Sequence, residues 1–282
     1  MRHKNFAVFI LSHGRAKNVK TLKTLDKGNY TGETIIICDN EDDQIEDYKK
    51  LGKKVIVFDK LEEMKRTDTE DNFGDHRLVV YARNKCHDIA KDLGLDYFLV
   101  LDDDYHQIAM KYIDDKKLKS KDIKNLDRTF DAMLDFLDVS GALTVTMAQG
   151  GDFIGGAENP NLRKGIGRKA MNSFFCRTDR PFKFTGSTNE DVNAYVTYGM
   201  KGKLMFTIYK LVIEQATTQQ NTGGLTDIYL DNGTYVKSFY SIICEPSCVK
   251  VAIMNSRHPR MHHKIDWNCC VPKIINEKYK RV

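Results

Sequence analysis

The sequence has no long hydrophobic run, no CxxC pair, no internal repeat and no linker rich in proline or serine. Its apolar runs fall far short of the roughly 20 residues that a membrane-spanning helix needs, so no transmembrane segment is expected. The apolar run at 6–11 is too short for a signal peptide, and no small-residue cleavage site follows it. We therefore expect a cytoplasmic protein in which residues 6–11 form the first strand.

The seven cysteines show no disulfide or zinc pattern. Their number is odd, and Cys269 and Cys270 are adjacent. Disulfide-rich domains and zinc ribbons have paired cysteines at characteristic spacings, which this sequence lacks. We expect reduced thiols, as in cytosolic proteins.

Positive charge is concentrated in two parts of the chain. The net charge is only +5, but residues 250–282 carry eight Lys or Arg against two acids, and residues 111–128 carry seven against four. Basic regions favour polyanions such as nucleic acid or phosphate groups. The alternative interpretation is a solvated surface with a basic tail.

Apolar runs alternate with helical patterns through residues 1–108. Strands are predicted at 6–11, 34–38, 54–58 and 97–101, and helices at 15–28, 42–52 and 77–94. This order predicts a parallel sheet with helices on both faces, whose ligands bind beyond the carboxyl ends of the strands. The polar segment 59–76 has no periodicity, which predicts a mobile loop.

Residues 109–282 show a less regular pattern of the same α/β class. Helices are predicted at 125–140 and 189–199, and strands at 142–148, 171–176 and 204–209. A glycine-rich loop is predicted at 149–169. Because no linker separates the halves, we expect a single domain over residues 1–282.

Three consecutive aspartates follow the apolar run 97–101. Side chains alternate along a strand, so Asp102 and Asp104 point to one side and Asp103 to the other. Two carboxylates at a strand end suit Mg²⁺ or Mn²⁺, which complete their shells with water and substrate phosphates. The alternative is an acidic turn that caps a following helix.

Other polar residues are predicted to lie at the same edge of the sheet. The turn LSHGRAKN offers Ser12 and Arg15 at a helix N-terminus, which is an anion site, but it lacks the GxGxxG pattern of dinucleotide-binding enzymes. Asp39 is placed to accept hydrogen bonds from a base or ribose, or to cap a helix. Arg83 and Asn84 are placed to hold a sugar or phosphate, or lie on a solvated helical face.

Several segments together resemble the phage-type TET-associated glycosyltransferase family. The Ser-x-x-Arg turn, the ARN helix and the apolar strand before DDD are similar to the nucleotide-sugar half of GT-A glycosyltransferases. Further segments carry the resemblance along nearly the whole chain: QGGDFIGG, RKAMNSFFCRTDRPFKF, NEDVNAY and GGLTDIYLDNGTYVKSFY. The resemblance implies a GT-A-like, Rossmann-like mixed sheet flanked by helices. It also implies a nucleotide-sugar-binding half at 1–108 and an acceptor-binding half with a basic C-terminal region at 109–282.

The resemblance implies a metal-dependent, inverting glycosyltransferase. Its donor would be UDP-glucose or a similar nucleotide-sugar, and its cofactor Mn²⁺ or Mg²⁺. Its acceptor would be the hydroxyl of 5-hydroxymethylcytosine or 5-hydroxymethyluracil in DNA, modified by a phage-encoded enzyme in the host cytoplasm. Three alternatives stay open: a GT-A enzyme with a protein, glycan or small-molecule acceptor, a sugar nucleotidyltransferase, and a non-enzymatic DNA-binding protein.

The resemblance also assigns roles to residues of this sequence. Asp102 and Asp104 match the metal-binding DxD motif, and Asp103 is assigned to the ribose or to solvent. Gly150 and Gly151 match a glycine loop through which an acceptor approaches the anomeric carbon.

Two further roles come from the second half. Asp191 is the expected general base, with Glu190 as the next choice. His262 or His263 is expected to complete the metal shell, although two surface histidines are the plainer interpretation. The sequence has no QxxRW motif, which argues against the acceptor half of a polysaccharide synthase.

Overall fold

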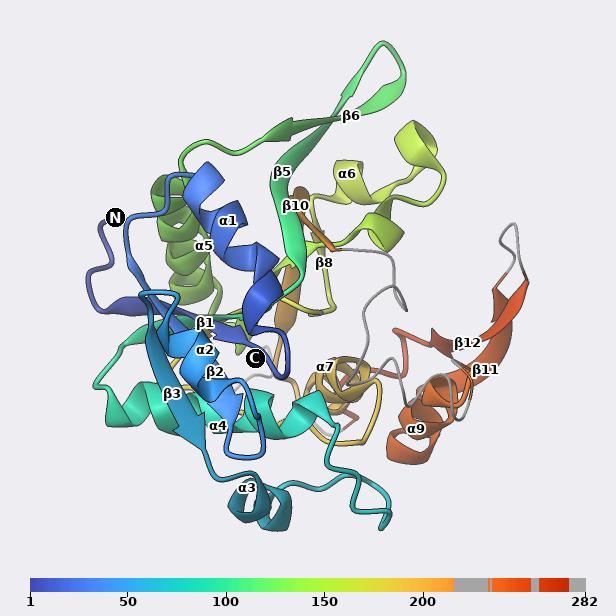
Figure 1. Cartoon of the computed structure of the whole chain (residues 1–282). Helices are drawn as coiled ribbons and strands as arrows, with labels where there is room; N and C mark the ends of the chain where they lie inside the picture. The colour runs from blue at the N-terminus through green and yellow to red at the C-terminus, as the bar shows by residue number, and fades with distance from the viewer. Residues whose placement is uncertain (216–232, 234, 255–258, 274–282) are drawn as a thin grey trace, which may run out of the picture.

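The computed structural model describes residues 1–215, 233, 235–254 and 259–273 (Figure 1). Within these residues, ten strands form one mixed sheet in the order β3-β2-β1-β4-β9-β7-β10-β5-β6, with β8 (Ile166–Gly167) paired to β10. A separate two-stranded sheet contains β11 (Val249–Met254) and β12 (Arg260–Ile265). The α/β class and the mixed sheet flanked by helices are as predicted.

The first half of the chain contributes a parallel block of strands. It contains β1 (Phe6–Leu11), β2 (Glu33–Asp39), β3 (Lys54–Phe58) and β4 (Tyr97–Asp102). The connecting helices are α1 (Lys20–Lys27), α2 (Ile45–Lys49) and α4 (Val79–Asp92), with a 3-10 turn, η1 (Ala16–Asn18), before α1. These elements confirm the predicted alternation, because each buried run in the sequence became a strand and each periodic segment a helix.

The segment 59–76 was wrongly predicted to be a mobile loop. It contains α3 (Lys60–Arg66), most of whose side chains are exposed, so the sequence shows no apolar periodicity there. Beyond α3 the backbone N–H groups of Gly186 and Ser187 donate to the carbonyl oxygens of Asp68 and Thr69, each at 2.9 Å. These bonds fix the segment against a distant part of the chain.

The second half extends the same sheet. Its main elements are α5 (Leu126–Ser140), β7 (Thr144–Ala148), β9 (Phe174–Arg177), α7 (Glu190–Met200) and β10 (Met205–Gln215). Strand β9 runs antiparallel between β4 and β7, so it joins the two halves into one continuous sheet. The glycine-rich segment holds only short elements, which are η2 (Gly150–Phe153), η3 (Gly156–Glu158) and α6 (Asn161–Lys164).

A long β-hairpin follows the three aspartates. It consists of β5 (Tyr105–Asp114) and β6 (Lys117–Asp122), and it projects from the body of the molecule (Figure 1). The tight turn has Asp115 and Lys116 at φ 47° and 58°, which suits the twist of a two-residue hairpin. The alternative in which the aspartates cap a helix is therefore wrong, because the chain continues as a strand.

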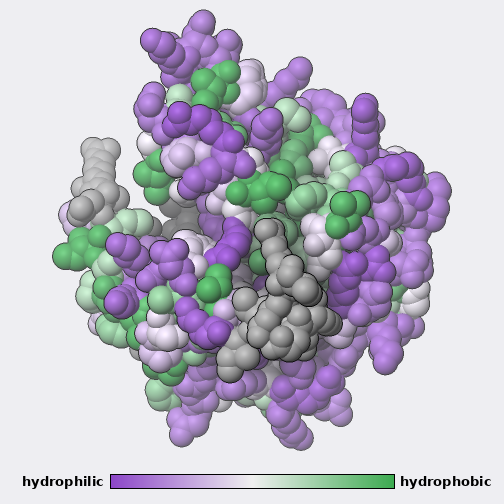
Figure 2. Space-filling model, turned by 180° about the vertical axis from the view of Figure 1, so that it is seen from behind, coloured by the Kyte–Doolittle hydropathy of each residue, from purple (hydrophilic) through white to green (hydrophobic). Residues whose placement is uncertain are grey.

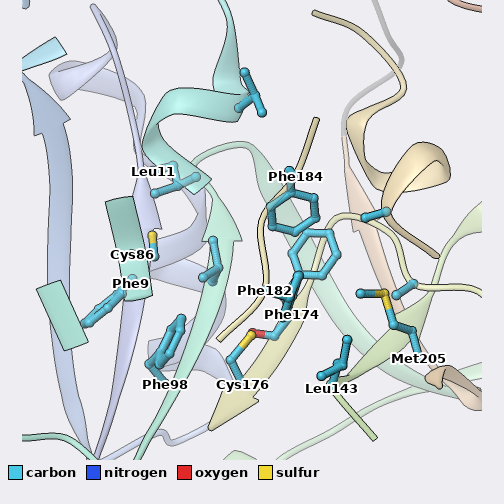
Figure 3. Close-up of a cluster of buried hydrophobic side chains, with 14 of the residues drawn as sticks. Phe9, Leu11, Cys86, Phe98, Leu143, Phe174, Cys176, Phe182, Phe184 and Met205 are labelled. Atoms are coloured by element: carbon cyan, nitrogen blue, oxygen red, sulfur yellow. The ribbon is translucent and has the colours of Figure 1, made fainter. Parts of the chain in front are cut away.

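The core lies on both faces of the parallel block. Along β1 consecutive side chains alternate, so that Phe9 and Leu11 join the cluster under α4 and α7, whereas Val8 and Ile10 join the cluster under α1 and α5. Figure 3 shows part of the first cluster, in which Phe174 of β9 meets Phe182 and Phe184 from the loop before α7, and Phe98 of β4 lies against Phe9. Burial on both faces is the expected state of central parallel strands.

The structure bears on two predictions, which concern membrane-spanning helices and disulfide bonds. No described helix is long and apolar enough to cross a membrane. All seven cysteines are described, and each is a free thiol.

Gly186 is a position where only glycine fits. Its φ is +93°, and a Cβ added there would lie 2.4 Å from Nδ2 of the buried Asn193. We expect Gly186→Ala to lower the free energy of unfolding by about 1–3 kcal/mol, because strain and a clash add. Urea denaturation measures this. Gly150→Ala is the control, since its Cβ would meet nothing within 4 Å; equal losses in both variants would contradict the argument.

Candidate active site

The carboxyl ends of β1, β2 and β4 meet at one edge of the sheet. The strand register pairs Leu11 with Ile37 of β2 and with Asp102 of β4. Ser12, Asp39 and Asp102 therefore lie at neighbouring strand ends. Ligands of parallel α/β sheets bind at such an edge.

Asp103 connects the first turn to the aspartate run. Its buried carboxylate accepts hydrogen bonds from the Ser12 hydroxyl at 2.5 Å and from Nη1 of Arg15 at 3.0 Å. Burial raises the pKa of Asp103, and the Arg15 guanidinium and the Ser12 hydroxyl oppose that rise. In this structure Asp103 fixes the turn that carries Ser12 and Arg15.

Asp39 lies in a polar cluster at the end of β2. Its carboxylate is 2.9 Å from Nδ1 of His13 and 2.9 Å from Nζ of the buried Lys60. Burial alone would raise the pKa of Asp39, but the hydrogen bonds from His13 and Lys60 outweigh it and lower the pKa. Asp39 is therefore held as a buried, charged acceptor at this edge.

Asp102 and Asp104 flank the buried Asp103. Oδ2 of Asp102 lies 3.2 Å from the Tyr105 hydroxyl and 3.4 Å from Nη2 of Arg83, and its side chain is 28% exposed. Burial, followed by the negative charges of Asp102 and Asp103, raises the pKa of Asp104 to about 6. A cation at this strand end would relieve the crowding of the three carboxylates.

Arg83 is the central residue of a buried ionic network. It bonds to Glu190 at the start of α7 and faces Asp102, and its guanidinium lies over the rings of Phe174 and Phe184 at 5.2 and 5.9 Å. Burial alone would lower the pKa of Arg83, but the acids around it raise the pKa above its ordinary value. A permanent positive charge thus connects the end of β4 with the first residue of α7.

Asn84 has a different set of contacts from its neighbour. Its amide nitrogen donates to the carbonyl oxygen of Phe184 at 3.0 Å, and its amide oxygen accepts the Phe184 N–H at 2.8 Å. The side chain thereby holds the loop before α7 against α4. Its assignment to the donor stays a prediction.

Glu190 and Asp191 begin α7, directly after Asn189 in a left-handed conformation with φ 56°. Both acids are buried. Burial raises the pKa of Glu190 to about 7, against the opposing charge of Arg83, and burial also raises the pKa of Asp191. Carboxyls whose pKa is raised toward neutrality are suited to accept a proton.

The two acids have different surroundings. Glu190 bonds Arg83, on the side of the aspartate run. The Asp191 carboxylate accepts a hydrogen bond from the backbone N–H of Val192 at 2.7 Å. The positive charges of Lys169 and Lys237 also act on it. Both acids lie near the charge of Arg83, and Asp191 also lies near those of the two lysines.

His262 and His263 lie side by side on β12, with ring centroids 4.2 Å apart. Nδ1 of His263 lies 3.2 Å from the amide nitrogen of Asn189, which brings β12 to the start of α7. Burial, with the charges of nearby basic residues, lowers the pKa of His263 to about 3, so the ring is neutral at physiological pH. Neutral imidazole is the form that binds metals.

The predicted metal ligands do not form a complete shell. Within the described parts of the chain, no group of three or more His, Cys, Asp or Glu side chains is arranged to hold a metal ion. The pair Asp102 and Asp104 nonetheless suits a hard divalent cation, which needs only one or two carboxylates when a diphosphate and water supply the other oxygens. The added histidine stays a prediction.

The predicted glycine loop is open to solvent. A Cβ at Gly150 or Gly151 would meet nothing within 4 Å, and both residues are exposed. Asp152 stabilises the turn, because its carboxylate accepts a hydrogen bond from the Gln149 N–H at 2.9 Å and forms an ion pair with Lys169. The arrangement leaves the glycine backbone free for an approaching molecule.

One protein family matches this chain over most of its length. The family is described as TET-Associated Glycosyltransferase, and it matches residues 6–224, well over half of the 282 residues. The chain belongs to the TET-associated glycosyltransferase family. It is a glycosyltransferase.

Two solved structures align with this TET-associated glycosyltransferase at low similarity. One is glucosyl-3-phosphoglycerate synthase from Mycobacterium tuberculosis in complex with Mn²⁺, UDP and phosphoglyceric acid, with a TM-score of 0.46 and 11% identity over 92% of this chain and 86% of that chain. The other is a proposed nucleotide-diphospho-sugar transferase from Desulfovibrio desulfuricans G20, with a TM-score of 0.40 and 9% identity over 86% and 95%. Similarity at this level establishes nothing about the substrate. No curated protein matches the sequence.

The TET-associated glycosyltransferase brings several predicted residues into one network. Asp102, Arg83 and Glu190 are in direct contact, and Asp191 lies next to Glu190. Ser12, Arg15 and Asp103 form a second group, and Asp39 a third.

Three basic residues of the candidate site were missed from the sequence. Lys60 was missed because α3 was expected to be a loop. Its position directly after β3 could have indicated a positive charge at the carboxyl ends of the strands. His13 lies inside the turn LSHGRAKN, where Ser12 and Arg15 are the more obvious partners for a phosphate. Lys169, which pairs with Asp152, follows the glycine loop and had no sequence signal.

Proposed function

We propose that this TET-associated glycosyltransferase moves a hexose from a UDP-hexose to the hydroxyl of a 5-hydroxymethylpyrimidine in DNA, with Mn²⁺ or Mg²⁺ as cofactor. The observation that supports it best is the ionic network Asp102–Arg83–Glu190 with Asp191 beside it. Arg83 lies between Asp102, at the end of β4, and two buried acids of raised pKa, Glu190 and Asp191. As a phage-encoded enzyme it would act in the cytoplasm of the host, where the DNA is.

The donor would bind across the carboxyl ends of β1, β2 and β4. Asp102 and Asp104 would hold the metal, which when bound supplies Lewis-acid chemistry to the diphosphate. Arg15, fixed by Asp103, would add a positive charge near the phosphates. Asp39, kept ionised by Lys60 and His13, would accept hydrogen bonds from the ribose or the base.

The acceptor hydroxyl would reach Asp191 along the open glycine loop at Gly150 and Gly151. Asp191 takes the hydroxyl proton as the oxygen forms its bond to the anomeric carbon. The bond from that carbon to the diphosphate oxygen breaks, and the electron pair leaves with the nucleoside diphosphate. A single displacement of this kind inverts the anomeric configuration.

Mass spectrometry of nucleosides tests the proposal. DNA containing hydroxymethylcytosine or hydroxymethyluracil is incubated with the enzyme, Mn²⁺ and a panel of nucleotide-sugars, beside Asp104→Ala. A hexose-sized gain on one base, absent with the variant, is the expected result. Donor hydrolysis without a gain on either base would assign a protein, glycan or small-molecule acceptor instead, and release of pyrophosphate would identify a nucleotidyltransferase.

The pH dependence of transfer tests the base. Because burial raises the pKa of Asp191, activity is expected to fall with decreasing pH at a pH above the ordinary aspartate range near 4. Asp191→Asn should lower kcat by about 10²–10⁴-fold and remove this ascending limb. Asp179→Asn, an exposed carboxylate beyond β9, is the matched control. An unchanged limb in Asp191→Asn would assign the base elsewhere.

A further inference from the structure

The hairpin of β5 and β6 gathers lysines on one face. The register pairs Met110 with Lys121, Tyr112 with Lys119, and Asp114 with Lys117. Directly paired residues of an antiparallel ladder point to the same side. We call this side the outer hairpin face, and it consists of Met110, Tyr112, Asp114, Lys117, Lys119 and Lys121.

The opposite side of the hairpin is turned toward the protein. Lys111 bonds to Glu214 of β10 at 2.6 Å and lies 5.8 Å from the Phe153 ring centroid, and Leu118 packs against the small cluster that includes Phe153. The outer hairpin face is therefore left to solvent. Figure 2 shows hydrophilic side chains around hydrophobic ones on the projecting hairpin.

The outer hairpin face is both basic and apolar. Lys119 pairs with Asp114, the one acid on this face, whereas neither Lys117 nor Lys121 forms an ion pair with another described residue. Met110 and Tyr112 are 47% and 40% exposed. Lysines around an exposed aromatic ring are suited to a sugar-phosphate backbone.

We propose that the outer hairpin face binds the phosphates of the duplex that carries the target base. This inference rests on the proposed function, because it takes DNA as the acceptor. Duplex DNA is the occupant that the geometry fits. Lys117, Lys119 and Lys121 recur at every second residue, about 6.6 Å, close to the axial rise of about two nucleotides of one strand.

The distance from the aspartates also fits a duplex. β5 begins directly after Asp104, and a strand rises about 3.3 Å per residue. Residues Met110 to Asp114, which pair with the three lysines, therefore lie about 20–33 Å from Asp104 along the strand. One turn of B-DNA is about 34 Å. A duplex with its target base at the site would present phosphates to the hairpin within one turn.

The test compares two triple variants. Lys117→Ala with Lys119→Ala and Lys121→Ala removes the outer lysines, and Lys50→Ala with Lys53→Ala and Lys54→Ala removes three exposed lysines near β3, at the other edge of the sheet. Fluorescence anisotropy with an unmodified 30-base-pair duplex gives Kd across a salt series. We expect the hairpin variant to bind at least about tenfold more weakly, with a salt slope reduced by about 2.7, and the control to match wild type.

Each outcome separates this inference from the proposed function. Donor hydrolysis without acceptor is expected to be unchanged in both variants. If wild type transfers sugar to DNA and the hairpin variant keeps the wild-type Kd and KM for DNA, the inference fails and the lysines only shield an edge strand. If the hairpin variant loses duplex binding while wild type modifies no DNA base, the binding face stands and the proposed acceptor fails. Equal binding of duplex RNA and duplex DNA by this face, with no transfer to DNA, would overturn the DNA assignment.

Discussion

Replacing Asp104 with alanine is expected to abolish Mn²⁺-dependent sugar transfer, with a loss of at least about 10³-fold in kcat/KM. Metal stabilisation of a leaving diphosphate contributes several kcal/mol to the transition state, and each 1.4 kcal/mol is about tenfold. Burial, followed by the negative charges of Asp102 and Asp103, raises the pKa of Asp104 to about 6, so a bound cation would relieve this carboxylate. Initial rates of nucleotide release over a Mn²⁺ titration measure the loss, and calorimetry of Mn²⁺ with UDP measures the binding.

Asp103→Asn is the matched control for this prediction. Asp103 is buried against Ser12 and Arg15, so its loss should lower the free energy of unfolding by about 1–3 kcal/mol and leave Mn²⁺ affinity close to wild type. The opposite pattern would reverse the assignment. Asp103→Asn would then lose Mn²⁺ binding, and Asp104→Ala would keep a Mn²⁺-dependent rate.

Arg83→Met is expected to cost about 3–5 kcal/mol of stability, because it leaves the buried Glu190 carboxylate without its cation. Methionine keeps the apolar part of the side chain beside the rings of Phe174 and Phe184. Combining Arg83→Met with Glu190→Leu should recover most of that stability while transfer stays lost, since a buried ion pair can be replaced by apolar side chains. Urea denaturation of both variants, with activity measured in parallel, separates the structural and the catalytic effect.

The deficit of Arg83→Met should also depend on pH. Without Arg83, the pKa of Glu190 in the folded state rises further above its ordinary value near 4.3. A carboxyl whose folded pKa is raised stabilises the fold at low pH and loses that contribution as pH rises through the folded pKa. The variant should therefore differ more from wild type at pH 8 than at pH 5. A deficit independent of pH would show that Glu190 is not the group left uncompensated.

The parallel block could be predicted because its signals are local. The runs that became β1, β2 and β4 are apolar on both faces, and the helix that became α4 has clear periodicity. β6 shows the opposite case. Its sequence KLKSKD has a single apolar residue, and it becomes a strand only because β5 pairs with it and β10 pairs with β5.

The candidate site was predictable as a set of residue types and only in part as a set of contacts. The sequence named Asp102, Arg83 and Glu190, and the structure shows that they touch. The bonds between Asn84 and Phe184 join residues 100 positions apart, and no local pattern encodes such a contact. Lys60 shows the same limit, because its importance depends on α3 packing beside the end of β2.

β5 lies between β10 and β6, so one of its two neighbours is synthesised much later than β5 itself. β5 ends at Asp114, whereas its neighbour β10 begins only at Met205. At about 5–20 residues per second, a ribosome needs roughly 5–20 seconds to make the intervening chain. The parallel block can form early, but the three aspartates must wait for α7 before the acids of the second half join them. The nascent chain therefore carries only the first half of the candidate site until α7 has been translated.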